Sequence, residues 1–107
     1  RDLLRHRDQL PDLVYFSDDY LARGAVIAIL ESGIRVPDQI QIATHSNRGN
    51  VPLFPLPLTR IEVDPRQVAE TIATQVARVL SNGKKPLPDC VVASTFVPGK
   101  TTRILSA

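Results

Sequence analysis

Residues 13–46 read LVYFSDDYLARGAVIAILESGIRVPDQIQIATHS, and this stretch decides the fold. A short apolar strand at 13–16 is followed by a mostly apolar helix at 20–32 and a second strand at 40–43. Strand, helix and strand in this order predict a βαβ unit, which is right-handed and has parallel strands. We therefore expect an α/β fold with a parallel sheet flanked by helices.

Polar turns follow both predicted strands, at residues 17–19 and 44–47. The carboxyl ends of parallel strands meet at one edge of the sheet, and open α/β sheets bind their ligands there. We therefore expect Asp18, His45 and Ser46 to surround a common crevice. The plainer alternatives are that the aspartates only cap the helix, that His45 is an ordinary loop residue, and that 44–47 is a simple turn.

The ends of the predicted helix carry recognisable signals. Asp18 or Asp19 can accept the free backbone N–H groups at its start, and Gly33 suits the left-handed conformation that ends many helices. We expect Asp19 to cap the helix and Asp18 to face the crevice. Residues 25–30 (AVIAIL) have no polar face, so the sheet covers one side and a second copy of the chain is expected on the other.

Beyond the βαβ unit, residues 51–57 (VPLFPLP) hold three prolines, which exclude a helix or a central strand. The alternation at 59–63 predicts a half-buried strand, and Asp64-Pro65 predicts a helix start. That helix is amphipathic and is expected to end at Asn82-Gly83. We further expect a strand over 89–97 and the end of a helix within residues 1–10.

Composition restricts the possible functions. The chain has 107 residues, 43% hydrophobic and 22% charged, which is typical of a soluble globular domain. With 13 basic and 11 acidic residues, the net charge of +2 does not favour nucleic-acid binding by this chain. No apolar run is long enough to span a membrane, and the single Cys90 has no partners at metal-ligand spacing. We expect no metal, no cofactor and no membrane association. The start inside an expected helix, without Met, suggests part of a longer protein.

Three segments resemble the LacI/GalR family of ligand-controlled transcription regulators. Residues 11–25 (PDLVYFSDDYLARGA) resemble the family's PDAVFxxNDxxAxGA segment. Residues 31–40 (ESGIRVPDQI) are similar to its ExGlrVPxDI segment, and residues 57–61 (PLTRI) to its PLTTI crossover strand. The resemblance covers nearly the whole chain, with sensible spacing between the segments.

The resemblance implies part of a periplasmic-binding-protein-like fold, with two lobes and a ligand cleft between them. Residues 1–57 would belong to the C-terminal lobe. Residues 58–88 would be a crossover strand and a helix of the N-terminal lobe, and residues 89–107 a return strand and tail. The DNA-binding helix-turn-helix and most of the N-terminal lobe would lie outside this chain. The protein would be cytoplasmic and would contact operator DNA only through that missing domain.

The resemblance also implies site residues. Asp18 takes the place of the family's effector-binding Asn/Asp, Ser46 that of the Asp in its GYDD segment, and Val63 that of a residue that is often polar. With His45 and Asn47, these are our candidate ligand contacts. The missing carboxylate at Ser46 departs from the family's pattern, because a carboxylate holds a sugar hydroxyl by charge-assisted hydrogen bonds. The effector is expected to be a sugar or a related small molecule.

The family's dimers use the corresponding helix and loop, so we expect a homodimer through Leu21, Ala25, Ile29, Leu53, Phe54 and Leu56. The function implied is the effector-binding and dimerisation portion of a LacI-type repressor or activator, not an enzyme. The alternative is a fragment of a periplasmic sugar-binding transport protein, which shares the fold. A small hydrolase that uses Asp18, His45 and Ser46 has little support, because adjacent residues at a strand end seldom reach each other correctly.

Overall fold

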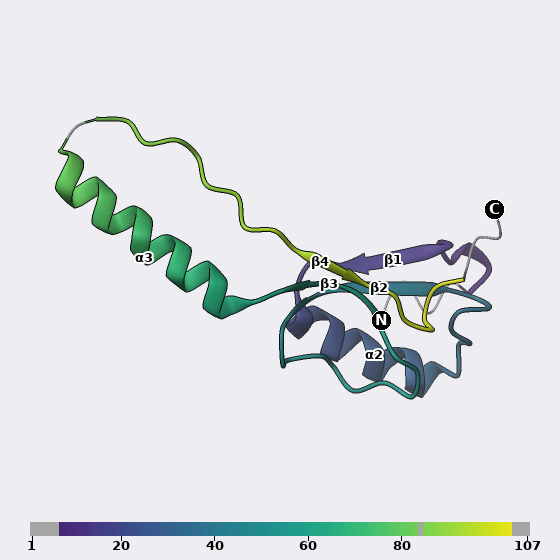
Figure 1. Cartoon of the computed structure of the whole chain (residues 1–107). Helices are drawn as coiled ribbons and strands as arrows, with labels where there is room; N and C mark the ends of the chain where they lie inside the picture. Colours follow the sequence, from purple (N-terminus) through teal and green to yellow (C-terminus); the bar gives the residue numbers. More distant parts are fainter. Residues whose placement is uncertain (1–6, 84, 104–107) are drawn as a thin grey trace.

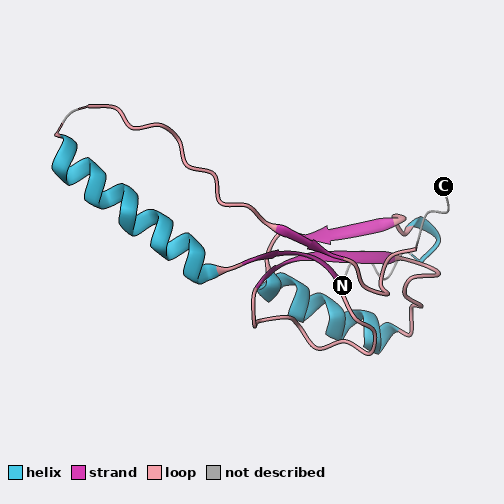
Figure 2. Cartoon of the chain, in the orientation of Figure 1, coloured by secondary structure: helices cyan, strands magenta, loops and turns pink. Residues whose placement is uncertain are grey.

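A four-stranded mixed sheet carries one helix on its face and a second helix on a projecting arm (Figures 1 and 2). The structure, a computed structural model, describes residues 7–83 and 85–103. The strand order is β1-β2-β3-β4, parallel except for the antiparallel β3–β4 pair. The elements, in chain order, are η1 (Arg7–Gln9), β1 (Leu13–Phe16), α2 (Asp19–Ser32), β2 (Gln41–Asn47), β3 (Thr59–Val63), α3 (Pro65–Asn82) and β4 (Thr95–Val97).

The predicted βαβ unit is confirmed. β1 and β2 are parallel neighbours, with Leu13 opposite Gln41 and Phe16 opposite Thr44. α2 packs on one face of this pair, and Gly33 ends it in the left-handed conformation. The buried cluster between helix and sheet comprises Val26, Ile29, Ile42 and Leu58. The core is therefore made of aliphatic side chains, as a chain without Trp or Met requires.

β2 is longer than the sequence suggests, which corrects one expectation. Residues 44–47 do not form the turn; they continue the strand, and the turn follows at residues 48–50. The cause is β3, which pairs with β2 from Ala43 to Asn47 and supplies ladder hydrogen bonds to a polar segment. Side chains along this part of β2 therefore alternate between the two faces of the sheet.

Two expectations near the chain ends are also corrected. Only residues 95–97 of the expected strand at 89–97 form β4, because β3 offers partners only there; residues 85–94 run without a ladder partner. Within the expected N-terminal helix, residues 7–9 form a single 3₁₀ turn, and residues 1–6 lie outside the described part.

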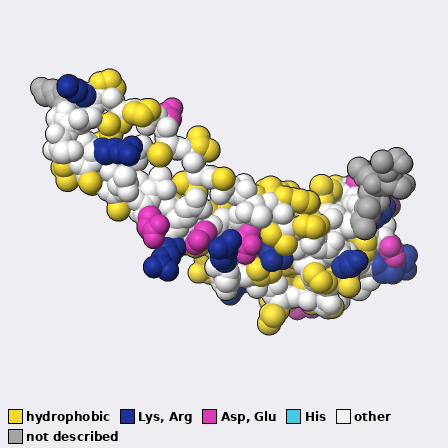
Figure 3. Space-filling model, viewed as in Figure 1, with side chains coloured by type: hydrophobic (Ala, Val, Ile, Leu, Met, Phe, Trp, Pro, Cys, Tyr) yellow, Lys and Arg dark blue, Asp and Glu magenta, His cyan; other side chains and the backbone are white. Residues whose placement is uncertain are grey.

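α3 and residues 85–94 form an arm that projects from the end of the sheet (Figure 1). The predicted start and end of the helix are confirmed, because Asp64 caps it by accepting the Arg66 N–H at 3.0 Å and Gly83 stops it. None of its side chains is buried, and hydrophobic side chains are visible along the arm in Figure 3. Within the described residues, neither α3 nor any other helix has the length and apolar character needed to cross a membrane.

Candidate functional site

The cap of α2 is Asp18 and not Asp19, which corrects the expectation. Asp18 is the cap: its Oδ1 accepts the Tyr20 N–H at 2.7 Å, and its side chain is exposed at the carboxyl end of β1. Asp19, expected to be the cap, is only 2% exposed. The geometry explains the exchange, because a cap residue must remain extended before the first helical turn, and Asp18 is (φ −149°, ψ 136°). Asp19, one position later, points toward β2.

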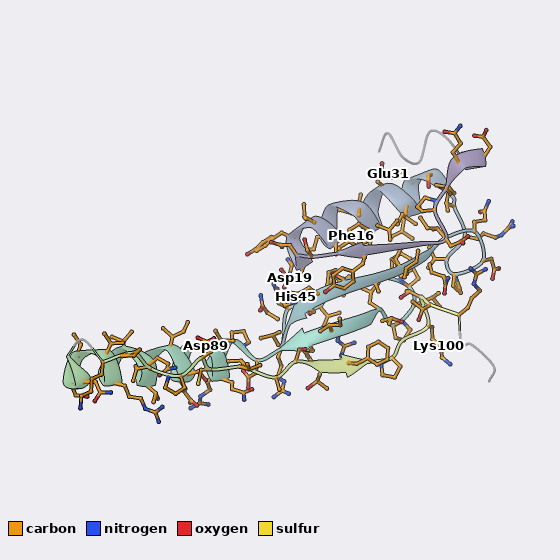
Figure 4. All side chains as sticks on the ribbon, turned by 90° about the horizontal axis from the view of Figure 1, so that it is seen from above. Phe16, Asp19, Glu31, His45, Asp89 and Lys100 are labelled. Carbon is orange, nitrogen blue, oxygen red and sulfur yellow. The ribbon has the colours of Figure 1, made fainter. Side chains whose placement is uncertain are left out.

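Asp19 joins α2 to the end of β2. Its Oδ2 accepts hydrogen bonds from the Asn47 backbone N–H at 3.3 Å, the Asn47 side-chain amide at 3.5 Å and the Asn50 side-chain amide at 3.1 Å. Burial opposes ionisation of this carboxyl, but the bonds from Asn47 and Asn50, aided by the Arg23 charge, outweigh it and lower the pKa of Asp19. Asp19 is therefore a carboxylate at neutral pH. Figure 4 shows Asp19 and His45 at the same end of the sheet.

The turn after β2 is held from two sides. On one side, the Arg23 guanidinium donates to Asn50 Oδ1 and lies 5.7 Å from the Tyr20 ring centroid. On the other side, the Arg48 backbone N–H donates to the Val63 carbonyl oxygen at 2.8 Å. The Arg48 side chain is 3.5 Å from the carboxylate of Asp64, the cap of α3. This turn consequently bridges the starts of both helices.

The structure brings three of the five candidate ligand residues to the carboxyl edge. Asp18 lies in the short link between β1 and α2. Asn47 and Val63 lie opposite each other at the ends of β2 and β3. Asp18 is exposed, and the other two are half-buried. Asp18 and Asn47 therefore lie at the carboxyl ends of neighbouring strands, and their role as ligand contacts remains a prediction.

His45 and Ser46 lie on opposite faces of β2. Ser46 is completely buried on the face that also carries Ile42, and its hydroxyl donates to the Asn47 carbonyl oxygen at 3.2 Å. His45 is half-buried on the other face, opposite Ile61 of β3. The two side chains therefore do not form a pair, and their roles as ligand contacts remain predictions.

The surface of α2 and the proline-rich loop is apolar, as expected. Leu21 is 60% exposed and Leu53 is 93% exposed, while Ala25, Phe54 and Leu56 are half-buried. Ile29 differs, because it is 3% exposed and belongs to the core of this chain. Between helix and loop lies a groove of about 500 Å³ lined by Arg23, Val26, Ile27, Val51, Pro52 and Leu53.

Sequence reasoning missed Asn50, Arg48 and the burial of Asp19. A signal was present in the Asn47-Arg48-Gly49-Asn50 segment, whose side chains favour turns and accept or donate hydrogen bonds. Among the described residues, no cluster of three or more His, Cys, Asp or Glu side chains could hold a metal ion, and Cys90 is an exposed free cysteine. The residues that gather at this edge are amides, carboxylates and arginines, side chains that can form hydrogen bonds with polar small molecules.

Comparison with known proteins identifies the family. The model of the periplasmic binding protein-like domain matches residues 1–102. The chain belongs to this family. The resemblance to LacI/GalR regulators is confirmed by relatives as well: the HTH-type transcriptional repressor PurR of Histophilus somni is 32% identical over 80 residues, covering 74% of this chain. PurR of Pasteurella multocida is 40% identical over 55 residues, covering 51% of this chain.

These relatives are longer than the chain. It spans 24% of the Histophilus protein and 16% of the Pasteurella protein. Among solved structures, a LacI family transcriptional regulator from Lactobacillus casei with bound sucrose has a TM-score of 0.71 at 18% identity, covering 94% of this chain and 37% of that one. The same regulator with bound glucose gives a TM-score of 0.70, also at 18% identity, covering 94% of this chain and 36% of that one. The predicted fold, a fragment of a periplasmic-binding-protein-like architecture, is therefore confirmed.

Proposed function

We propose that this chain is the effector-binding and dimerisation portion of a LacI-type transcription regulator. The observation that carries the proposal is the carboxyl edge of the βαβ unit, where an exposed Asp18 follows β1 and Asn47, anchored by Asp19, ends the neighbouring strand β2. The relatives' names support a regulator over a transport protein and over an enzyme, since they are transcriptional repressors. The regulator would act in the cytoplasm and contact operator DNA through a domain outside these residues.

The proposed ligand is a sugar or a related polyhydroxylated molecule. One oxygen of Asp18 accepts the Tyr20 N–H, and the other is available on an exposed side chain for a ligand hydroxyl. Asn47 would add an amide, and Val63 an apolar contact. His45 would reach the ligand from the face of β2 opposite α2, whereas the buried Ser46 would stabilise the strand on the α2 face. Structures of a regulator with this fold that hold sucrose and glucose support this choice of class.

The proposed lobe arrangement follows from the way the chain leaves and re-enters the sheet. β3 and β4 are antiparallel neighbours, and the arm of α3 and residues 85–94 connects them. We assign residues 1–57 to one lobe, residues 58–88 to a crossover and a helix of the other lobe, and residues 89–107 to the return. Effector binding would then change the angle between lobes and shift the population of the DNA-binding state.

The proposed homodimer uses the exposed side of α2 and the proline-rich loop. A twofold contact places the same patch of both copies together, which suits an apolar helix beside an apolar loop. Leu21 and Leu53 are its exposed centre, with Ala25, Phe54 and Leu56 around them. Ile29 supports this surface from the core rather than touching the second copy.

Titration calorimetry with glucose and sucrose, on the intact protein that contains this chain, tests the ligand proposal. Asp18→Ser retains a good helix cap but removes the carboxylate, whereas Asp18→Ala removes both. We expect both variants to bind the preferred sugar more weakly by about 1–3 kcal/mol, the usual cost of a lost charged hydrogen bond. Only Asp18→Ala should also lower the thermal midpoint.

The outcomes separate the two roles of Asp18. If Asp18→Ser binds as tightly as the parent chain while Asp18→Ala is merely less stable, Asp18 is a cap and not a ligand contact. If the parent chain binds neither sugar, a broader thermal-shift screen of polar small molecules replaces them. An intact protein that binds no member of that screen would contradict the effector-binding function.

A further inference from the structure

Three hydrogen-bond donors converge on a single buried oxygen at the carboxyl edge. The Asn47 backbone N–H, the Asn47 side-chain amide and the Asn50 side-chain amide all donate to Asp19 Oδ2. Asp19 is 2% exposed, so this oxygen is not open to a ligand. A buried carboxylate is costly unless it accepts hydrogen bonds, and here Oδ2 accepts three, from the last residue of β2 and from the turn after it.

This carboxylate fixes the end of β2 and the turn after it. Asn47 is held by its backbone and its side chain, and Asn50 is held between Asp19 and the Arg23 guanidinium. Arg48 lies between these anchored residues and pairs with Asp64 at the start of α3. The position of the whole turn, and of the residues it presents at the edge, is thereby tied to the first turn of α2.

We propose that Asp19 is a positioning residue of the effector site: it does not contact the ligand but holds Asn47 and the turn 48–50 in the binding geometry. The inference rests on the proposed function, because it assigns Asn47 to the ligand edge. Preorganisation of this kind increases affinity, since the free protein has already lost the freedom that a ligand would otherwise have to restrict.

A carboxylate suits this role better than an amide. An amide at position 19 could offer these donors one oxygen, but that oxygen would be uncharged, and the amide NH2 group would replace the second carboxylate oxygen. The ionised state of Asp19 also makes the three bonds charge-assisted, and such bonds are stronger than neutral ones. Asp19→Asn is therefore expected to loosen the turn without changing the size of the side chain.

The first measurement is amide hydrogen exchange on the 107-residue chain, which needs no ligand. Asp19→Asn should accelerate exchange at residues 47–50 about tenfold, in proportion to the hydrogen bonds lost. Asp38→Asn is the matched control, since Asp38 is exposed in the loop before β2 at the other end of the strand. It should leave exchange at 47–50 unchanged.

The second measurement is rescue. Asn50→Asp alone places a second carboxylate against Asp19, whereas Asp19→Asn with Asn50→Asp restores a donor–acceptor pair and leaves residue 50 beside Arg23. We expect glucose or sucrose affinity to fall about tenfold in Asp19→Asn and to recover at least partly in the double variant. A residue that only stabilised the fold would lower the thermal midpoint without this reversal of affinity.

The outcomes distinguish this inference from the proposed function. Unchanged exchange at 47–50 in Asp19→Asn would overturn the positioning role. Faster exchange with unchanged sugar affinity would show that the turn is held but does not serve the ligand, and would also overturn it. If the parent chain binds no sugar, the failure lies with the proposed function, and exchange alone decides whether Asp19 holds the turn.

Discussion

The hydroxyl of Thr101 donates to the carbonyl oxygen of Ile42 at 2.7 Å, although 59 residues separate them in the chain. The same hydroxyl accepts the Thr59 backbone N–H at 3.0 Å, and the Thr101 carbonyl accepts the Ile42 N–H at 3.0 Å. Thr101 is fully buried. The segment after β4 is therefore fastened to both central strands of the sheet.

Removing this hydroxyl should destabilise the sheet. Thr101→Val keeps the shape of the side chain but leaves the buried Thr59 N–H and Ile42 carbonyl without their partner. We expect the free energy of unfolding to fall by about 1–3 kcal/mol, measured by urea denaturation. Thr74→Val is the control, because Thr74 is exposed on α3 and bonds only its own helix. Equal losses in both variants would contradict the fastening role.

Gly99 should not tolerate a side chain. A Cβ there would lie 2.4 Å from the Pro57 carbonyl oxygen and 2.5 Å from both the Leu58 carbonyl carbon and the Thr59 nitrogen, all of which are backbone atoms. Gly99→Ala should therefore lower the thermal midpoint, with a cost of about 1–3 kcal/mol or more. Gly24→Ala is the opposite case: its Cβ meets nothing within 4 Å, and it should stabilise α2 by roughly 0.5–1 kcal/mol.

Asp19 should give stability a dependence on pH in acid. Its folded pKa is lowered from the ordinary value of 3.8, so folding favours the deprotonated form. This contribution is fully present above pH 3.8 and is lost as the pH falls through the folded-state pKa. Chemical denaturation at a series of pH values below 5 should show a shallower decline for Asp19→Asn than for the parent chain. If the stability of both proteins falls equally with pH, Asp19 is not the cause of the acid dependence.

Variants at Leu53 and Ile29 should distinguish the association of two copies from the stability of the core. Leu53→Ser removes a 93% exposed apolar side chain, so it should weaken the homodimer without unfolding the chain. Ile29→Ala removes a core side chain and should cost about 2–5 kcal/mol of stability. Sedimentation velocity across a concentration series, with urea denaturation alongside, checks both. A parent chain that stays monomeric at high concentration would contradict the dimer.

Local signals predicted both long helices. Asp64-Pro65 and Gly83 mark the ends of α3, Gly33 marks the end of α2, and each of these residues acts within its own neighbourhood. Parallel pairing of β1 with β2 also followed, because a helix between two strands leaves little alternative. The class of the fold was predictable for the same reason.

The errors concern residues whose partners are distant in the chain. The segment 44–47 is polar like a turn, but β3, which begins twelve residues later, draws it into the ladder. Asp19 could equally have been the cap, and only Asn47 and Asn50, 28 and 31 residues away, show why it is buried. Ile29 belongs to the core and not to the expected dimer surface, because a helix that is apolar on every side does not reveal which side faces its own sheet.

The exposure of α3 has a consequence for how the chain melts. An 18-residue helix without a buried side chain depends mainly on its own cap, on the Arg66–Glu70 pair and on backbone bonds, all of them local. Its side-chain links to described residues outside the helix are the Arg48–Asp64 pair at its cap and the bond from the Gln75 amide to the Pro88 carbonyl oxygen, so its unfolding is only weakly coupled to that of the sheet. Heating would fray the arm first over a broad range, before the sheet and α2 disassemble together in a sharper transition.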